Sequence, residues 1–222
     1  MGKSKELATF TDAGGTLSGN LTFDSTNPSI VLGADNNQRS YIQRYSDDLY
    51  IYNKEAAGDV YLGSANTTRM TIDASGRVTM PYQPAFRAGL SASNTQDNSN
   101  PYTFTGVIAW DQVHVNRGSY YSNSNGRFTA PVAGCYCFHM SALLSTSITN
   151  SGGMRFVLNG SGLDAPIPYT YATGNFVFLS GSIVVNMNAN DWVGVENYGG
   201  HALHINPSSS NEHNGFSGYL IG

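Results

Sequence analysis

Hydrophobic and polar residues alternate in short runs from residue 20 to residue 81, and no apolar spacing typical of a helix competes with them. The runs are LTF, SIVLG, SYIQRY, DLYIYN, GDVYLG, RMTID and GRVTM, separated by turn-forming residues such as 35–37 and 75–76. Strands that recur at about 8–12 residues predict an all-β unit.

Each of these runs offers few apolar side chains to any one face. In SYIQRY, for example, Tyr41 and Tyr45 fall on one side of a strand and Ile42 falls on the other. About 60 residues of such strands bury too little apolar surface to fold alone, since domains this small are marginal. We therefore predict that three copies of the chain wrap around a shared axis, so that each strand buries one face inward.

The alternation becomes strongly aromatic between residues 110 and 140. Tyr136 and Phe138 follow Gly134 at every second position, which places both rings on one face of a pleated strand. Further strands are predicted at residues 154–158, 176–185 and 192–198. Since about 140 residues are enough to enclose a complete core, this part of the chain is predicted to form a β-sandwich.

Several residues of this region stand at set spacings: an aromatic residue, an asparagine, two more aromatic residues and a strand of the form Gly-x-aromatic-x-aromatic. They are Trp110, Asn116, Tyr121, Phe128, Gly134, Tyr136 and Phe138. This pattern resembles the C1q family, the globular heads of the C1q and tumour-necrosis-factor type. Two positions depart from it, because Trp110 stands where phenylalanine is usual and Met140 stands where a final aromatic residue is usual. Both residues are still large and apolar.

Two further stretches are similar to the same family. Residues 85–88, which include Phe86, are similar to its opening strand. Residues 215–221, GFSGYLI, resemble its closing strand through Phe216, Gly218 and Tyr219. The resemblance covers residues 84–222 and implies a C-terminal jelly-roll β-sandwich with these motif residues in its core. It also implies a tight homotrimer around an apolar axis.

Composition divides the chain into three parts. Residues 1–19 are polar and glycine-rich, and we predict that they form an attachment arm. Residues 20–81 are the β-rich segment, and the stretch from residue 66 to residue 81 is similar to the shafts of bacteriophage tail and head fibres. Residues 82–222 are the C1q-like head, which follows a joint stiffened by Pro81 and Pro84.

Charge and hydropathy argue against several classes of partner. The formal net charge is −4, only 12% of the residues are charged, and there is no basic run, so a nucleic-acid partner is not expected. No apolar stretch approaches the roughly 18 residues that a membrane-spanning helix needs. The first ten residues carry charge without a following apolar core, which argues against a secretory leader.

The residues that bind metals in other proteins do not form a recognisable pattern here. Cys135 and Cys137 lie two apart on one predicted strand, too far from each other for an easy disulfide, and we expect both to be buried small side chains.

His139 could meet its two copies at a threefold axis and hold an ion, although a satisfied core or interface histidine is the favoured interpretation. His201 and His204 lie three apart in a segment whose glycines and proline forbid a helix, which argues against a zinc site. Some heads of this family bind calcium, but no acidic loop indicates it here, so we predict no cofactor and no metal.

Catalytic residues are equally hard to nominate. No Gly-x-Ser-x-Gly turn provides a serine nucleophile. The acids Asp164, Asp191 and Glu196 are isolated in the sequence, so no general acid–base pair can be assigned. We therefore predict that the protein is not an enzyme, and a polysaccharide depolymerase is only the third functional hypothesis.

Binding and assembly remain as the predicted function. Aromatic rings and polar groups in exposed loops suit sugars, and the candidate receptor-binding residues are Tyr169, Tyr171, Asn197, Tyr198 and His201. Packing of each tyrosine under its own loop is the alternative interpretation. Three weak sites on one rigid head gain roughly 10²–10⁴ in avidity, which suits a glycan on a cell surface.

The predicted protein is a homotrimeric virion fibre of the bacteriophage tail or head. Its arm would dock on other virion structural proteins, and its C1q-like knob would bind a host-surface glycan or protein, or cap the trimer. A secreted C1q-like lectin or immune-type binding protein is the alternative hypothesis. Sequons at Asn20, Asn66 and Asn159 fit that alternative.

Overall fold

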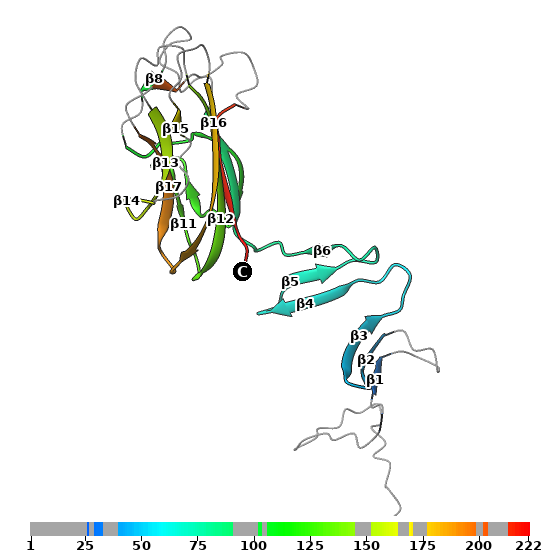
Figure 1. Ribbon diagram of the computed structural model, residues 1–222. Helices are drawn as coiled ribbons and strands as arrows, with labels where there is room; N and C mark the ends of the chain where they lie inside the picture. The colour runs from blue at the N-terminus through cyan, green and yellow to red at the C-terminus, as the bar shows by residue number, and fades with distance from the viewer. Residues whose placement is uncertain are drawn as a thin grey trace, which may run out of the picture. The chain divides into compact units, whose positions relative to one another are not determined.

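The computed structural model describes residues 26, 29–32, 40–90, 102–103, 106–144, 152–163, 169–170, 177–198, 202–203 and 213–222. These residues form strands, turns and loops and include no helix, so the all-β prediction is confirmed for them. The chain divides into two compact units, Met1–Thr79 and Met80–Gly222, which are drawn in Figure 1.

The first unit contains two small antiparallel sheets. One consists of β1 (Ser29–Leu32), β2 (Ser40–Tyr45) and β3 (Asp48–Asn53), in that order. The other consists of β4 (Val60–Ser64), β5 (Thr67–Ile72) and β6 (Val78–Thr79). Two-residue hairpin turns favour a positive φ, and Ser46, Ala65 and Asn66 have it in the turns after β2 and β4.

The sheet β1–β2–β3 has two faces of different chemistry. Residues that pair directly across antiparallel strands point to the same face, and Ile42 pairs with both Ile30 and Ile51. The aliphatic face of this sheet contains Ile30, Ile42, Leu49 and Ile51, with Arg44 opposite Leu49. The opposite face, called the tyrosine face below, consists of Tyr41, Tyr45, Tyr50 and Tyr52.

The sheet β4–β5–β6 also has an aliphatic face. Val60 pairs with Ile72, Ile72 pairs with Val78, and Leu62 pairs with Met70. This second aliphatic face is built by the same alternation as the first, with Tyr61, Thr71 and Thr79 on its reverse side.

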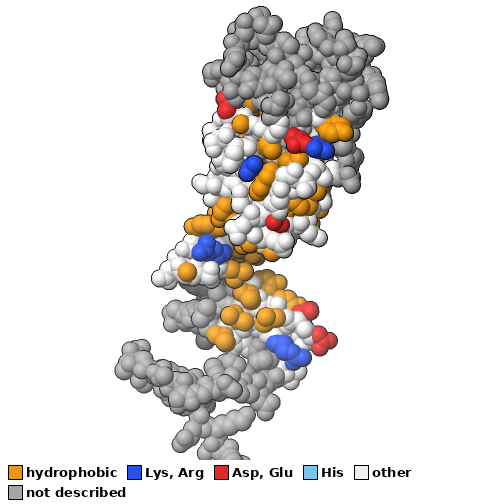
Figure 2. All heavy atoms as spheres, turned by 90° about the vertical axis from the view of Figure 1, so that its left-hand side faces the viewer, with side chains coloured by type: hydrophobic (Ala, Val, Ile, Leu, Met, Phe, Trp, Pro, Cys, Tyr) orange, Lys and Arg blue, Asp and Glu red, His pale blue; other side chains and the backbone are white. Residues whose placement is uncertain are grey.

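Several side chains of these two aliphatic faces are exposed among the described residues of the first unit. Leu49 is 69% exposed, Ile51 and Val78 are each 52% exposed, and Leu62 is 48% exposed. Among the described residues of the first unit, none belongs to the buried core, whose members all lie in the second unit. Apolar side chains therefore remain on the surface, as the orange spheres in Figure 2 show.

The second unit is a sandwich of two antiparallel sheets, visible as two layers in Figure 1. The first sheet runs β10 (Tyr121–Ser122), β11 (Arg127–Thr129), β17 (Trp192–Tyr198), β13 (Gly152–Leu158) and β14 (Ser161–Gly162), and β15 (Tyr169–Thr170) also pairs with β13. The second runs β8 (Tyr102–Thr103), β18 (Ala202–Leu203), β12 (Gly134–Leu144), β19 (Gly215–Leu220), β7 (Ala85–Gly89) and β9 (Gln112–Arg117). The long strand β16 (Val177–Met187) pairs with β12 over its whole length. Strands that are distant in sequence are neighbours in both sheets, as in a jelly roll.

An aromatic cluster fills the space between the two layers. The ring of Phe86 lies 4.8 Å from that of Tyr121, 5.0 Å from that of Phe128 and 4.8 Å from that of Phe216 between centroids. The side chains with 4% exposure or less include Phe86, Trp110, Tyr121, Phe128, Tyr136, Phe138, Met140 and Phe216. The motif residues of the sequence thus supply most of the large side chains of this core.

Candidate functional site

The outer face of strand β12 is the first candidate surface. Tyr136, Phe138 and Met140 point into the sandwich and are almost completely buried. Cys135 and Cys137 alternate with them and therefore point away from the first sheet, and both thiols are free and half-buried on this outer face. The expectation that both cysteines are buried is not met in the single subunit, because strict alternation on one strand places them on the outer face, where both are half-buried.

Cys137 lies in the middle of an apolar row that crosses three strands. It pairs with Val184 of β16 on one side and with Tyr219 of β19 on the other. Val184 is 60% exposed and Tyr219 is 52% exposed. A hydrogen bond with the Cys137 thiol raises the pKa of Tyr219. Farther along the same face, Phe178 is 55% exposed opposite Leu143.

Tyr219 was expected in the core together with Phe216 and Gly218 of the closing strand, but it lies elsewhere. Phe216 and Gly218 face the core, and Tyr219 lies on the outer face because it follows Gly218 directly in an extended strand. Its exposed ring therefore belongs to the apolar row and contributes nothing to the sandwich core.

A polar strip lies next to this row. The Nδ1 atom of His139 lies 2.9 Å from the hydroxyl of Ser182, and His139 itself is exposed. The next residues across the sheet in the same row are Ser217 and Arg87. Within the described residues, no group of three or more histidine, cysteine or acidic side chains is arranged to hold a metal. The disfavoured alternative, an ion shared by three copies of His139, is not tested by the single chain.

The predicted receptor-binding residues are only partly described. Gly153 of β13 pairs with Tyr169 of β15 on one side and with Tyr198 of β17 on the other, so the two tyrosines occupy one row of the sheet. Asn197 is the neighbouring residue in β17, where only its backbone is described. The other two candidates, Tyr171 and His201, lie outside the described residues.

Tyr198 has charged neighbours that the sequence did not reveal. The ring is 42% exposed, and the guanidinium carbon of Arg155 lies 4.9 Å from its centroid. Arg155 also forms an ion pair with Glu196, directly opposite it on the neighbouring strand. Glu196, an isolated acid in the sequence, is therefore paired in the fold. This pairing depends on strand register, which no local pattern of the sequence specifies.

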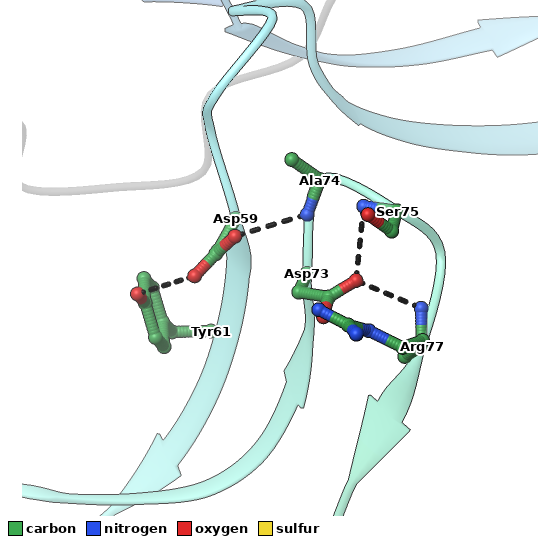
Figure 3. Close-up of polar contacts among 6 residues, drawn as sticks. All are labelled: Asp59, Tyr61, Asp73, Ala74, Ser75 and Arg77. Carbon is green, nitrogen blue, oxygen red and sulfur yellow. Dashed lines mark hydrogen bonds and ion pairs between the residues drawn. The ribbon is translucent and has the colours of Figure 1, made fainter.

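Two carboxylates fix the turn between β5 and β6, as Figure 3 shows. Asp73 accepts hydrogen bonds from the backbone N–H groups of Ser75 and Arg77, both at 2.9 Å, and from Nε of Arg77 at 2.7 Å. Asp59 accepts one from the backbone N–H of Ala74 at 3.0 Å and one from the hydroxyl of Tyr61 at 2.7 Å. The backbone and side chain of Arg77 lower the pKa of Asp73. The carboxylate therefore stabilises the turn above its unfolded pKa, and this stabilisation is lost as the pH falls through the lowered value.

Substitution of Asp73 by alanine is expected to loosen this turn without changing the C-terminal unit. Two backbone N–H groups and the Arg77 side chain lose their acceptor, so trypsin should cleave after Arg77 several-fold faster than in the unmodified protein. Ser75→Ala is the matched control, because it keeps the backbone N–H that Asp73 binds. Equal cleavage rates in all three proteins would contradict the assigned role of Asp73.

The comparison with known families decides the identity of the larger unit. The pattern of the C1q domain family matches residues 85–221, which is more than half of the chain. The chain belongs to the C1q domain family. Similar solved structures include the globular domain of zebrafish complement 1qA protein, which is 16% identical, with a TM-score of 0.48 over 63% of this chain and 98% of its own. Murine APRIL at pH 5.0 is 12% identical, with a TM-score of 0.47 over 63% of this chain and 99% of its own. Eiger TNF from S. frugiperda is 10% identical, with a TM-score of 0.42 over 63% and 93%.

The asparagine of the C1q domain motif has a specific structural role. The side-chain oxygen of Asn116 accepts a hydrogen bond from the backbone N–H of Tyr121 at 3.1 Å, and its amide nitrogen donates to the carbonyl of Tyr121 at 2.8 Å. The hydroxyl of Tyr121 then donates to the carbonyl of Trp110 at 3.0 Å inside the core. Burial raises the pKa of Tyr121, so the phenol stays protonated and keeps this bond. Asn116 thus fixes the chain at the entry of strand β10.

Replacement of Asn116 by alanine is expected to lower the free energy of unfolding of the C1q domain by about 1–3 kcal/mol, because two partly buried hydrogen bonds disappear together. The measurement is a denaturant midpoint at fixed protein concentration. Asn116→Asp keeps the acceptor and loses the donor, so its free energy of unfolding should lie between those of the alanine variant and the unmodified protein. An alanine variant as stable as the unmodified protein would show that the two hydrogen bonds of Asn116 with the backbone of Tyr121 do not stabilise the domain.

The described residues contain no helix that could cross a membrane.

Proposed function

We propose that the protein is a homotrimeric, non-enzymatic fibre whose C1q domain binds a receptor on a target surface. Residues 20–81 form its β-rich shaft, and residues 1–19 attach it to other structural proteins. On this proposal the fibre belongs to a bacteriophage virion and projects from the tail or the head. Its receptor is a host-surface glycan, and the C1q domain also closes the trimer.

One observation carries the trimer: large apolar side chains are left in water in both units. On the aliphatic face of the first sheet, Leu49 and Ile51 are more than half exposed among the residues that the structure describes. A hollow of about 190 Å³ lies at the end of the first sheet, lined by Ile42, Ile51 and Val60 among others. Such a hollow can receive an apolar side chain of a second copy. Contact between copies would then bury the apolar side chains of the shaft.

The C1q domain offers a second surface for the same assembly. The row formed by Val184, Cys137 and Tyr219 lies on the outer side of the long sheet, and exposed Phe178 is a separate apolar position on the same face, beyond the polar strip of His139 and Ser182. Permanent interfaces of this kind bury roughly 2,000–5,000 Å² in total. At about 25 cal/mol per apolar Å², the gross driving force is tens of kcal/mol before ordering costs, so the assembly would be obligatory.

The tyrosine row on the first sheet supports a glycan as the ligand of the C1q domain. Tyr169 and Tyr198 share one row of the first sheet, because both pair with Gly153. Arg155 and Glu196 beside Tyr198 add hydrogen-bonding groups to this region. Aromatic rings with nearby polar groups match a ligand that has both apolar ring faces and hydroxyls.

The first experiment is light scattering on the full-length protein, which should give three chains per particle. Adsorption to host cells and binding to a glycan array then test receptor recognition, with Tyr198→Ala expected to weaken both. Labelling of virions with an antibody against the C1q domain tests the location. A monodisperse single chain would refute the trimer, and cleavage of capsular polysaccharide by the protein would replace binding with a depolymerase activity.

A secreted C1q-like lectin is the second candidate, and one feature favours it. Asn66 heads an Asn-Thr-Thr sequon and is exposed at the two-residue turn between β4 and β5. An attached glycan on protein from its natural source, detected as a mass lost on glycosidase treatment, would support this candidate. Labelled virions would exclude it.

A further inference from the structure

The tyrosine face of the sheet β1–β2–β3 forms a continuous row of aromatic rings. The centroid of Tyr41 lies 5.3 Å from that of Tyr52, and the centroid of Tyr52 lies 5.7 Å from that of Tyr50. Tyr45 extends the row with a centroid distance of 6.4 Å to Tyr50. Tyr45 is 56% exposed and Tyr52 is 46% exposed, so much of this row is open to solvent.

Polar groups stand between and beside these rings. Gln43 pairs with Tyr50 and Asp48 pairs with Tyr45, so both side chains point to the tyrosine face. The Lys54 ammonium lies 6.0 Å from the centroid of the Tyr41 ring. One carboxylate and one ammonium leave this face close to neutral. A neutral face argues against phosphate-rich ligands and anionic membranes, which require clustered positive charge.

The reverse side of the same sheet is the aliphatic face, and the two faces have different requirements. Ile30, Ile42, Leu49 and Ile51 carry no polar atoms in their side chains, so they gain most from burial against another copy of the chain. The four phenols keep a hydroxyl that can bond to water or to a ligand. When the aliphatic face turns toward the copies in the proposed trimer, the tyrosine face of the same thin sheet turns outward.

We propose that the tyrosine face is a second binding site, in the shaft, for a neutral polysaccharide. Apolar faces of the sugar rings lie against the phenol rings, and sugar hydroxyls bond to the tyrosine hydroxyls, Gln43 and Asp48. This proposal rests on the proposed trimer only for its outward orientation. Three copies of the face on one fibre match a polymer with repeating units, and such repetition raises the overall affinity by avidity.

The test uses the full-length protein in affinity electrophoresis with three soluble neutral polysaccharides: dextran, mannan and β-1,3-glucan. Hyaluronan serves as an anionic comparator. At least one neutral polysaccharide should retard the protein, and hyaluronan should not. Tyr50→Ala and Tyr52→Ala should each weaken that retardation about tenfold, because each removes an aromatic contact that is present in every subunit.

Two matched variants locate the binding. Tyr61→Ala removes another exposed tyrosine of the first unit, one that lies outside the tyrosine face, and should leave retardation unchanged. Val132→Ala changes an exposed side chain of the C1q domain that lies outside its tyrosine row and should also leave retardation unchanged. Loss of binding in Tyr198→Ala alone would overturn the proposal and move the polysaccharide to the C1q domain. Equal binding by all variants, or no binding to any of the three polysaccharides, would also overturn it.

Nitration of the unmodified protein gives an independent measurement that does not depend on the folding of variants. The four tyrosines should react with tetranitromethane in the free protein, and the bound polysaccharide should protect them. Tyrosines that are unreactive without polysaccharide would mean that another copy covers this face, which overturns the proposal. Light scattering on the same sample separates the two claims: single chains that still bind through Tyr50 and Tyr52 refute the proposed trimer and support this site.

Discussion

Replacement of Val184 by glutamate is expected to convert the proposed trimer into single chains. Val184 is 60% exposed in the isolated subunit and lies in one row with Cys137 and Tyr219. If this row is the contact between subunits, each trimer would bury three unpaired carboxylates, and each of them carries a desolvation penalty of several kcal/mol. The measurement is the number of chains per particle from light scattering, which should fall from three to one at micromolar concentration.

Val132→Glu is the matched control for this experiment. Val132 is the same residue type and is 48% exposed, but it lies in the connection before β12 and outside the apolar row. It should leave three chains per particle. A trimeric Val184→Glu protein would show that the row is not the contact surface, and the apolar side chains on this face would then need another partner.

The faces of the strands follow from the sequence because side-chain alternation is a local property. The runs SYIQRY and DLYIYN match strands β2 and β3 residue for residue, and their division into aliphatic and tyrosine faces follows from the period of two. The same rule places Tyr136 and Phe138 in the core. It also places Cys137 outside, but the expectation for the cysteines came from how often free cysteine is buried in proteins generally. The period of the strand outweighs that general tendency.

Register and pairing over long sequence distances could not be predicted in the same way. The short strands β14 and β15 each contain two residues and exist only because both pair with β13. The row that joins Tyr169 to Tyr198 through Gly153 depends on three strands meeting in one register. Arg155 was not among the candidate residues, since its contact with Tyr198 arises only when β13 and β17 are neighbours. A candidate site of this kind is a property of the sheet, and the sequence supplies only its parts.

Replacement of Phe138 by alanine is expected to have the largest effect on the stability of the C1q domain. Phe138 is completely buried, and its ring contacts those of Phe86, Phe128 and Phe216, with centroids between 5.6 and 6.3 Å. Loss of a buried phenylalanine leaves a cavity and costs about 3–5 kcal/mol. The measurement is guanidinium unfolding at one fixed protein concentration, because the stability of an oligomer depends on concentration.

The neighbouring glycine provides the decisive test of how tightly this core is packed. A Cβ atom on Gly218 would lie 2.3 Å from Cδ1 of Phe138 and 2.9 Å from Cε1 of Phe86, so Gly218→Ala alone should destabilise the domain by about 1–3 kcal/mol through overpacking. When Phe138→Ala and Gly218→Ala are combined in one double variant, the alanine side chain at position 218 enters the space that the Phe138 ring has left. The two losses should therefore sum to clearly more than the loss in the double variant. Strictly additive losses would mean that Phe138 and Gly218 do not share this space and that the glycine of the closing strand is required for another reason.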